Sequence, residues 1–317
     1  MDRIMQIAVN TNLAEMNTFI GRFAKKTFDW DAFPASRSFP DLARAQMRYI
    51  GAGGAYEKVG DLSTLQPGAF TLSIVTQMPG KYAAAHAHEC KEAFLGLSGQ
   101  LTVGWVWDDE VIEATLSAKD MCLNDLGRPH GFRNDGVGPV VCSIMVGTSA
   151  PLPPHYTCHP RDSEEEVARH FGAKPGKYTR LDPLSNDPRH QEFARHVVRY
   201  SQQKPIAHSA GFSSLTYIGD GGAPPEKSTM HLIHLPRGSA VNLYEREVED
   251  VFFTLEGVVT AGWLDKGRIY EERLGPKDMI FNPPGRAHYF RNDGLEDAQF
   301  MMVIGSPNPE HIQFMAA

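Results

Sequence analysis

The stretch GKYAAAHAHECKEAFLGLSG, residues 80–99, has the spacing of a β-strand that carries metal ligands. His86 and His88 stand two residues apart, and on an extended strand such residues point to the same face. Glu92 follows four residues later and keeps that orientation if the chain remains extended. We therefore expect two imidazoles and one carboxylate to project into the same space.

A second segment, DLGRPHGFRN at residues 125–134, supplies a further candidate ligand, His130, directly after a turn. Three imidazoles and one carboxylate form a donor set typical of first-row transition metals, with room left for a substrate or dioxygen. A single inward histidine is more often a core residue than a ligand, but three at this spacing with a carboxylate favour metal binding. The sequence thus predicts a metal site of His86, His88, Glu92 and His130.

The chain also contains an internal duplication at an offset of 158 residues. FRNDG occurs at 132–136 and again at 290–294, and ungapped pairing of 92–147 with 250–305 gives 21 identities in 56 positions. Each copy consists of short runs rich in β-branched and aromatic residues, separated by Gly- and Asp-containing turns. The predicted strand-forming segments are 70–80, 92–107, 112–124, 140–147, 231–238, 250–263, 270–282 and 299–305. Two similarly folded all-β sandwiches or small barrels are therefore expected.

The length of 317 residues fits two domains. Helical signal is confined to the remaining segments. Ser163 and Glu166 form a capping box that predicts a short helix through His170, and residues 186–203 predict a second helix. The predicted organisation is an N-terminal arm 1–45 lying across the fold, a metal-binding domain 46–150, a partly helical linker 151–210 and a second domain 211–317.

Composition narrows the class of protein. Lys and Arg number 31 against 38 Asp and Glu, a net charge of −7, so nucleic acid is not an expected partner. The four cysteines form no C-x-x-C pair, which argues against a disulfide framework or a thiolate zinc site. No apolar run approaches the length of a membrane helix, and we expect a cytoplasmic protein with no membrane partner.

The histidine segment resembles the first motif of the cupin superfamily, G-x5-H-x-H-x3-E-x6-G. Gly80, His86, His88, Glu92 and Gly99 match it at every position. Together with the duplication, the resemblance covers about 80–150 and 235–305. It implies a bicupin, with two tandem double-stranded β-helix (jelly-roll) barrels in one chain.

The second cupin motif, G-x5-P-x-G-x2-H-x3-N, is matched in part. Gly127, His130 and Asn134 fit it, whereas Asp125 replaces the proline and Lys119 the first glycine. These departures concern turn geometry and leave the ligands intact.

The second copy lacks the ligands. At the offset of 158, Tyr244 replaces His86, Arg246 replaces His88 and Asp250 replaces Glu92, while His288 persists. Arginine has no lone pair available for a metal. We expect a second barrel without metal, whose polar residues Tyr244, Arg246, Asp250 and His288 form a structural relic of the site or, alternatively, an anion site.

A complete first site beside a degenerate second one is similar to quercetinase-type and ring-cleaving bicupin dioxygenases. This resemblance implies an oxidoreductase that holds one divalent metal per chain, Fe(II) in preference to Mn, Ni or Zn, and that uses O2 on a small aromatic or enolic substrate. Glu92 would act both as ligand and as general base. Tyr82, Phe94 and Phe132 share the orientation of the ligands and are candidates for the pocket wall, or core residues.

Two alternatives stay open. The first is a redox-neutral metal-dependent isomerase, lyase or decarboxylase, in which the metal only polarises a carbonyl. The second is a non-catalytic small-molecule-binding cupin, which is disfavoured because the first copy keeps every ligand. Bicupins resemble a fused dimer of single cupins, and apolar residues of the arm need cover, so a homo-oligomer is also expected.

Overall fold

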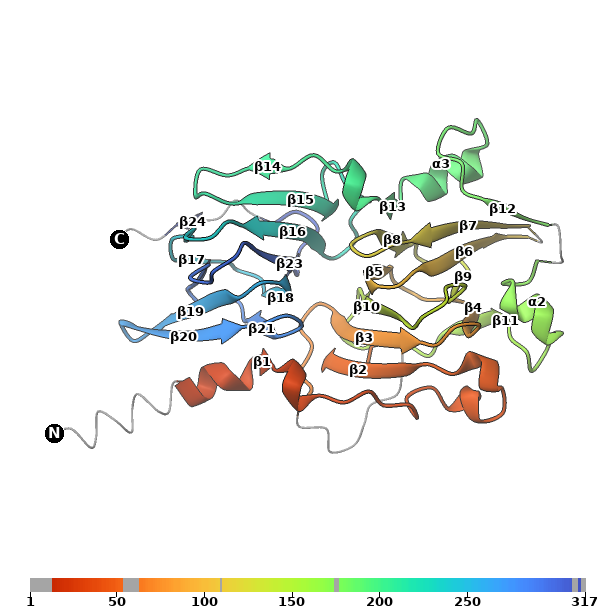
Figure 1. Cartoon of the computed structure of the whole chain (residues 1–317), viewed down its shortest axis with the longest axis horizontal. Coiled ribbons are helices and arrows are strands. Elements are labelled where there is room, and N and C mark those ends of the chain that lie inside the picture. The colour runs from red at the N-terminus through yellow and green to blue at the C-terminus, as the bar shows by residue number, and fades with distance from the viewer. Residues whose placement is uncertain (1–12, 54–62, 109, 174–176, 310–312, 315–317) are drawn as a thin grey trace. The chain divides into compact units, whose positions relative to one another are not determined.

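The computed structural model describes residues 13–53, 63–108, 110–173, 177–309 and 313–314. Two compact units make up the chain (Figure 1). The first-barrel unit contains residues 27–203 and 220–226, and the second-barrel unit contains the described residues of 1–26, 204–219 and 227–317. The predicted arm 1–45 is thus shared between the units, and the predicted boundaries at 45, 150 and 210 stay a prediction.

Two six-stranded sheets form the first barrel. One has the order β13 (Val197–Val198), β8 (Met121–Asn124), β5 (Glu92–Ser98), β10 (Val140–Val146), β3 (Thr71–Gln77) and β2 (Ala45–Ile50). The other has the order β11 (His155–Cys158), β4 (Tyr82–Ala87), β9 (His130–Arg133), β6 (Leu101–Trp107), β7 (Glu110–Leu116) and β12 (Tyr178–Arg180). Neighbouring strands are antiparallel except β12 and β7, which are parallel. Buried side chains from both sheets, among them Phe94, Val103, Trp105 and Phe132, pack into one core.

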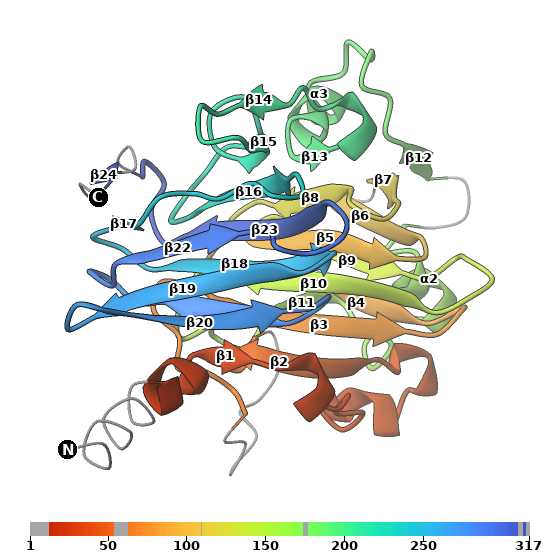
Figure 2. The ribbon, with the colours of Figure 1, turned by 60° about the vertical axis from the view of Figure 1, so that its left-hand side comes forward.

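The second barrel repeats this plan. One sheet has the order β1 (Ile20–Gly21), β21 (Met279–Asn282), β18 (Asp250–Glu256), β23 (Ala298–Ile304), β16 (Thr229–Leu235), β15 (Ser213–Ile218) and β14 (Ile206–Ala207). The other has the order β20 (Arg268–Leu274), β19 (Val259–Asp265), β22 (His288–Arg291), β17 (Tyr244–Glu245) and β24 (Gln313–Phe314). Figure 2 shows β18, β23 and β16 running alongside one another. The predicted all-β fold with two barrels is confirmed.

The duplication extends to individual hydrogen bonds. In the first barrel the buried Trp105 indole donates to Asn124 Oδ1 at 2.9 Å, and in the second Trp263 donates to Asn282 Oδ1 at 2.7 Å. Because the pair occurs in both copies, with and without the histidine set, it serves packing rather than chemistry.

The departures from the second cupin motif have a simple backbone explanation. Lys119, at the position of the first motif glycine, adopts a φ of +68°, and Lys277 in the other copy has a φ of +69°. Both lysines thus occupy the left-handed region that favours glycine. The turn geometry is therefore kept although the glycine is not.

Helices are few. The described helical segments are residues 13–18, α2 (Glu165–Arg169), α3 (Pro188–Ala194) and the 3₁₀ helices η1 (Phe23–Lys25), η2 (Pro34–Arg37), η3 (Pro40–Leu42) and η4 (Tyr200–Gln202). None of the described helices is long and apolar enough to span a membrane.

Two helix predictions need correction. The helix predicted over 186–203 ends at Ala194, because Val197 and Val198 pair with β8 and extend the first-barrel sheet. These β-branched residues gain more from the sheet edge than from helix continuation. The predicted capping box is also absent, since the cap of α2 is Glu164 and its side chain makes no capping hydrogen bond.

Two glycines of the second barrel allow a matched test of turn packing. Gly257 and Gly267 have φ values of +69° and +74°, but a Cβ atom at Gly257 would lie 2.6 Å from the Asp297 carbonyl oxygen, whereas one at Gly267 meets nothing within 4 Å. We expect Gly267→Ala to cost about 1–2 kcal/mol of stability from backbone strain alone. Gly257→Ala adds overpacking and should cost about 2–5 kcal/mol in all. Denaturant unfolding of both variants checks this, and equal losses would contradict it.

Candidate metal centre

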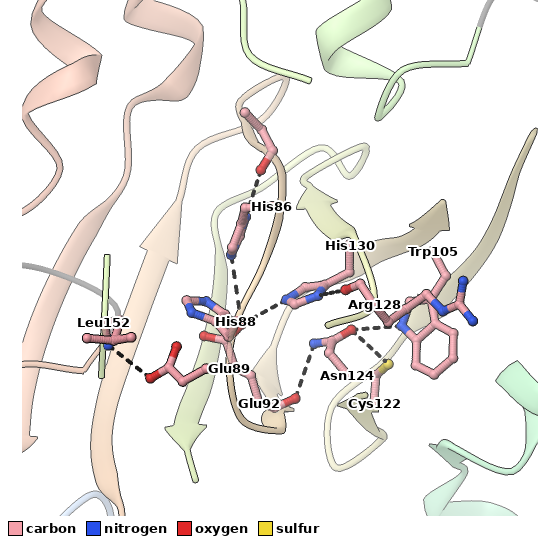
Figure 3. A network of polar contacts seen from close by, with 11 residues as sticks. His86, His88, Glu89, Glu92, Trp105, Cys122, Asn124, Arg128, His130 and Leu152 are labelled. Carbon is pink, nitrogen blue, oxygen red and sulfur yellow. Dashed lines mark hydrogen bonds and ion pairs between the residues drawn. The ribbon is translucent and has the colours of Figure 1, made fainter. Parts of the chain in front are cut away.

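The four predicted ligands come together inside the first barrel. His86 lies on β4, His88 follows the end of that strand, Glu92 begins β5 and His130 begins β9. Their nearest ligand atoms all lie within 4.8 Å of one another, and all four side chains are buried. Across the described part of the chain they are the one group of this kind. Figure 3 shows the three rings turned toward the carboxylate.

The distances suit the first coordination shell of a metal ion. Glu92 Oε2 lies 2.9 Å from the Nε2 atom of His130, 3.5 Å from that of His88 and 3.9 Å from that of His86. Ligands about 2.1 Å from a common ion are separated by roughly 3–4 Å. A divalent ion therefore fits this set without large movements of the side chains.

Backbone carbonyls fix the orientation of two rings. His86 Nδ1 donates to the Ala84 carbonyl at 2.7 Å, and His130 Nδ1 donates to the Arg128 carbonyl at 2.8 Å. With Nδ1 bound to a carbonyl, Nε2 is the atom that each ring turns toward the centre of the site and the one that would bind a metal. These carbonyl contacts are the outer-sphere support that metal-binding histidines normally have.

The charge states of His86 and Glu92 also favour metal binding. Burial, together with the neighbouring rings of His130 and His88, lowers the pKa of His86 to about 3, so this imidazole is neutral. Burial by itself would raise the pKa of Glu92, but attraction to His88, His130 and His86 outweighs it and lowers the pKa to about 2. At neutral pH the site thus offers a carboxylate and an unprotonated imidazole to a cation.

A small chamber adjoins the four ligands. Its volume is about 30 Å³, space for about two water molecules. It is lined by Phe33, Arg44, Gln46, Ser73, Val75, His86, His88, Glu92, Phe132, Ile144, Pro154 and Tyr156. Among the described residues, Gln46 Oε1 and Ser73 Oγ are buried there without a hydrogen-bond partner. Such orphaned polar atoms are rare in protein interiors and indicate a place for a polar ligand.

Arg44 gives the chamber a positive charge. Its side chain is buried, its guanidinium lies 3.8 Å from the centre of the Phe33 ring, and its Nη1 atom donates to the Leu42 carbonyl at 3.2 Å. Burial lowers the pKa of the guanidinium, while Tyr156 and Glu92 oppose this effect. Within the described residues no carboxylate forms an ion pair with Arg44. A buried arginine of this kind is set to bind an anion.

Of the three aromatic residues predicted to line the pocket, Phe132 lies in the chamber wall. Phe94 packs behind the ligands, with its ring centre 5.8 Å from His130 and 5.1 Å from Phe132. Tyr82 is fully buried in a separate cluster with Leu42. Both therefore lie among core residues, outside the lining of the chamber.

In the second barrel the corresponding residues form a closed polar network. Asp250 Oδ2 accepts hydrogen bonds from Tyr244, Arg246 and His288 at 3.3, 3.1 and 3.1 Å, and Oδ1 accepts one from Asn282 at 2.8 Å. Burial raises the pKa of Asp250, but His288 and Arg246 reverse this effect and lower it. Because the carboxylate already has a cationic partner within the chain, the arrangement supports the structural interpretation of this barrel.

Comparisons with known proteins agree with the duplicated architecture. Residues 73–147 match the family model described as a cupin domain. The chain is similar to the formate complex of oxalate decarboxylase from Lactobacillus farciminis, with a TM-score of 0.64 and 13% identity over 92% of this chain and 87% of that one. It is also similar to an oxalate decarboxylase variant from Bacillus subtilis, with a TM-score of 0.64 and 14% identity over 92% of this chain and 78% of that one.

A further structure of the Bacillus subtilis enzyme, reported for its Mn(II) centres, has a TM-score of 0.64 and 13% identity over 94% of this chain and 79% of that one. At these identities the likeness concerns the fold. No curated protein sequence matches the chain.

Proposed function

Since the chain belongs to the cupin superfamily and is a bicupin, we propose that its first barrel is the active site of a metal-dependent enzyme that cleaves a small organic acid without net oxidation, most simply as a decarboxylase. The observation that carries this proposal is Arg44, a buried cation without a carboxylate partner among the described residues, at the edge of the His86, His88, Glu92 and His130 set. A substrate carboxylate supplies the missing partner.

The size of the chamber favours this reaction over dioxygenation of a ring. A cavity of about 150 Å³ holds benzene, whereas the chamber has about 30 Å³. A carboxylate head fits beside the ligands, but an aromatic ring together with dioxygen does not. The similarity to oxalate decarboxylases supports the same choice. The dioxygenase prediction has no such support.

The groups of the site have separate roles in the proposed reaction. A divalent metal held by the four ligands would polarise a substrate oxygen and stabilise negative charge. Arg44 binds the carboxylate through its planar fork, and the Leu42 carbonyl and the Phe33 ring orient the guanidinium. The small buried chamber excludes bulk water, which strengthens these interactions.

Decarboxylation requires one proton. The bond between the carboxylate carbon and its neighbour breaks, CO2 leaves, and the electron pair that remains on the neighbouring carbon is protonated. That proton comes from solvent, because Glu92 is a carboxylate at neutral pH. We propose that Glu92, whose Oε2 atom faces the centre of the site, accepts the proton from solvent and passes it to that carbon.

The donor set indicates a class of metal ions rather than one element. Imidazole with carboxylate suits Mn, Fe, Ni or Zn. The Mn(II) centres of the similar Bacillus subtilis enzyme make Mn the first choice for reconstitution, ahead of the predicted Fe.

Arg44→Gln tests the assignment. Loss of a charge-assisted hydrogen bond to a substrate typically costs about 1.5–3 kcal/mol, so we expect kcat/KM to fall roughly 10- to 150-fold. Arg44→Lys keeps the positive charge but lacks the planar pair of N–H donors. Its kcat/KM should therefore lie between those of Arg44→Gln and the unaltered protein. Arg37→Gln, at an exposed position, is the control and should leave the rate unchanged.

The assay measures CO2 release and O2 consumption in parallel on Mn-loaded protein, with oxalate, malonate and 2-oxo acids offered as substrates. Metal-dependent CO2 release without net O2 uptake supports the proposal. O2 uptake equal to product, without release of CO2, would overturn it in favour of the dioxygenase prediction.

A further inference from the structure

A larger pocket lies next to the metal chamber in the same unit. Its volume is about 440 Å³, roughly three times that of a cavity that holds benzene. The 3₁₀ helices η2 and η3, the segment 151–154 and strand β11 contribute to its wall. We call it the outer pocket.

The outer pocket and the chamber share part of their walls. Phe33, Arg44, Pro154 and Tyr156 line both spaces. The guanidinium of Arg44 lies 3.8 Å from the centre of the Phe33 ring. A ligand whose charged end binds Arg44 can therefore extend into the outer pocket.

The described lining of the outer pocket is mainly apolar, and none of its described residues is acidic. Phe39, Leu42, Pro151 and Leu152 supply much of the apolar surface, and Leu152 remains 61% exposed. An exposed leucine at the edge of a pocket can gain contact with an apolar ligand.

The polar groups of the outer pocket favour negative charge. They include Arg44, which has no carboxylate ion pair among the described residues, and His159. Arg161 also lines the pocket, but its charge is balanced by Asp162 at 2.8 Å. His159 Nδ1 accepts the backbone N–H of Arg161 at 3.1 Å, so the neutral ring carries its proton on Nε2 and is a donor. Burial, followed by Arg161, lowers the pKa of His159, in agreement with a neutral ring at neutral pH.

From these features we infer that the substrate is a monocarboxylate with an apolar body, either an aryl group or a medium-length chain. Its carboxylate binds Arg44 beside the metal ligands, and its body fills the outer pocket. This inference rests on the proposed function, since it names the substrate class of the same site. A two-carbon diacid such as oxalate would leave the outer pocket empty.

Isothermal titration calorimetry with unreactive probes tests the inference in both metal-free and Mn-loaded protein. The probes are acetate, butanoate, hexanoate and 3-phenylpropanoate, with oxalate and 3-phenylpropan-1-ol as comparators. Each buried methylene group should tighten binding about fourfold, so hexanoate, with four more methylene groups, should bind roughly 250-fold tighter than acetate. The alcohol lacks the carboxylate and should bind much more weakly than 3-phenylpropanoate.

Two variants test separately the contacts of the ligand's apolar body and those of its carboxylate. Leu152→Asp should weaken binding of hexanoate and 3-phenylpropanoate at least tenfold and leave acetate unchanged. Leu184→Asp is the matched control, because this leucine is 90% exposed and lies outside the pocket lining. Arg44→Gln should weaken all carboxylates and spare the alcohol.

The outcomes distinguish this inference from the proposed function. Equal affinity for acetate and hexanoate, or no effect of Leu152→Asp, would overturn the apolar-body substrate while leaving the active-site assignment intact. A clear dependence on chain length that is lost in Leu152→Asp supports the inference, even if the CO2 assay fails and the reaction class has to be changed.

Discussion

His130→Ala should remove the metal from the protein, while His288→Ala should leave the metal in place. His130 supplies one of four buried donors, whereas its counterpart 158 residues later hydrogen-bonds to Asp250 in a network that contains Arg246. Loss of an outer-sphere partner alone typically costs about 10- to 100-fold in metal affinity, so loss of a direct ligand should exceed this. Activity should disappear together with the metal.

Elemental analysis after dialysis against metal-free buffer provides the measurement, and we expect one equivalent per chain in the unaltered protein and in His288→Ala. Circular dichroism should show that the strands of His130→Ala persist, because packing of the buried core holds the barrel. Two equivalents per chain, with one lost in each variant, would contradict the assignment of the metal to the first barrel.

Glu92→Gln should lower the rate by about 10²- to 10⁴-fold even when the metal site is saturated. Glutamine keeps an oxygen that can coordinate, but it does not accept a proton at neutral pH. The three imidazoles remain, so the variant should bind metal more weakly and still fill at high metal concentration. The rate at saturating metal therefore isolates the proton-transfer role from the ligand role.

Glu89→Gln is the matched control for this experiment. Glu89 is exposed, lies three residues before Glu92 and accepts the backbone N–H of Leu152, a hydrogen bond that a glutamine oxygen also forms (Figure 3). Its activity should equal that of the unaltered protein. If the rate of Glu92→Gln recovers almost completely at saturating metal, the proton-transfer role is wrong and Glu92 is a ligand only.

The metal centre could be predicted because its information is local. His86 and His88 share a strand face by the alternation of β-structure, and Glu92 begins the next strand. The duplication added a second kind of information, since the replacement of a ligand by Arg246 distinguished the two barrels. The fold could be predicted because the alternation of β-structure and the duplication are both visible in the sequence.

Apart from Phe132 and the ligands themselves, the chamber wall could not be predicted, because long-range strand pairing places it. Arg44 immediately precedes β2, which pairs with β3, and Tyr156 lies on β11, which pairs with β4 and stands opposite His86. Neither residue belongs to a spaced motif, and both come from segments expected to be an arm and a linker.

The replacement of a metal by Arg246 has a consequence for how the protein responds to its surroundings. The guanidinium of Arg246 is covalently part of the chain, so dilution, a competing ion or a chelator cannot remove it. The charge that balances Asp250 is therefore present as soon as the chain folds. Metal loading is then a single event without cooperativity between the copies, and its dependence on free metal concentration is that of one independent site.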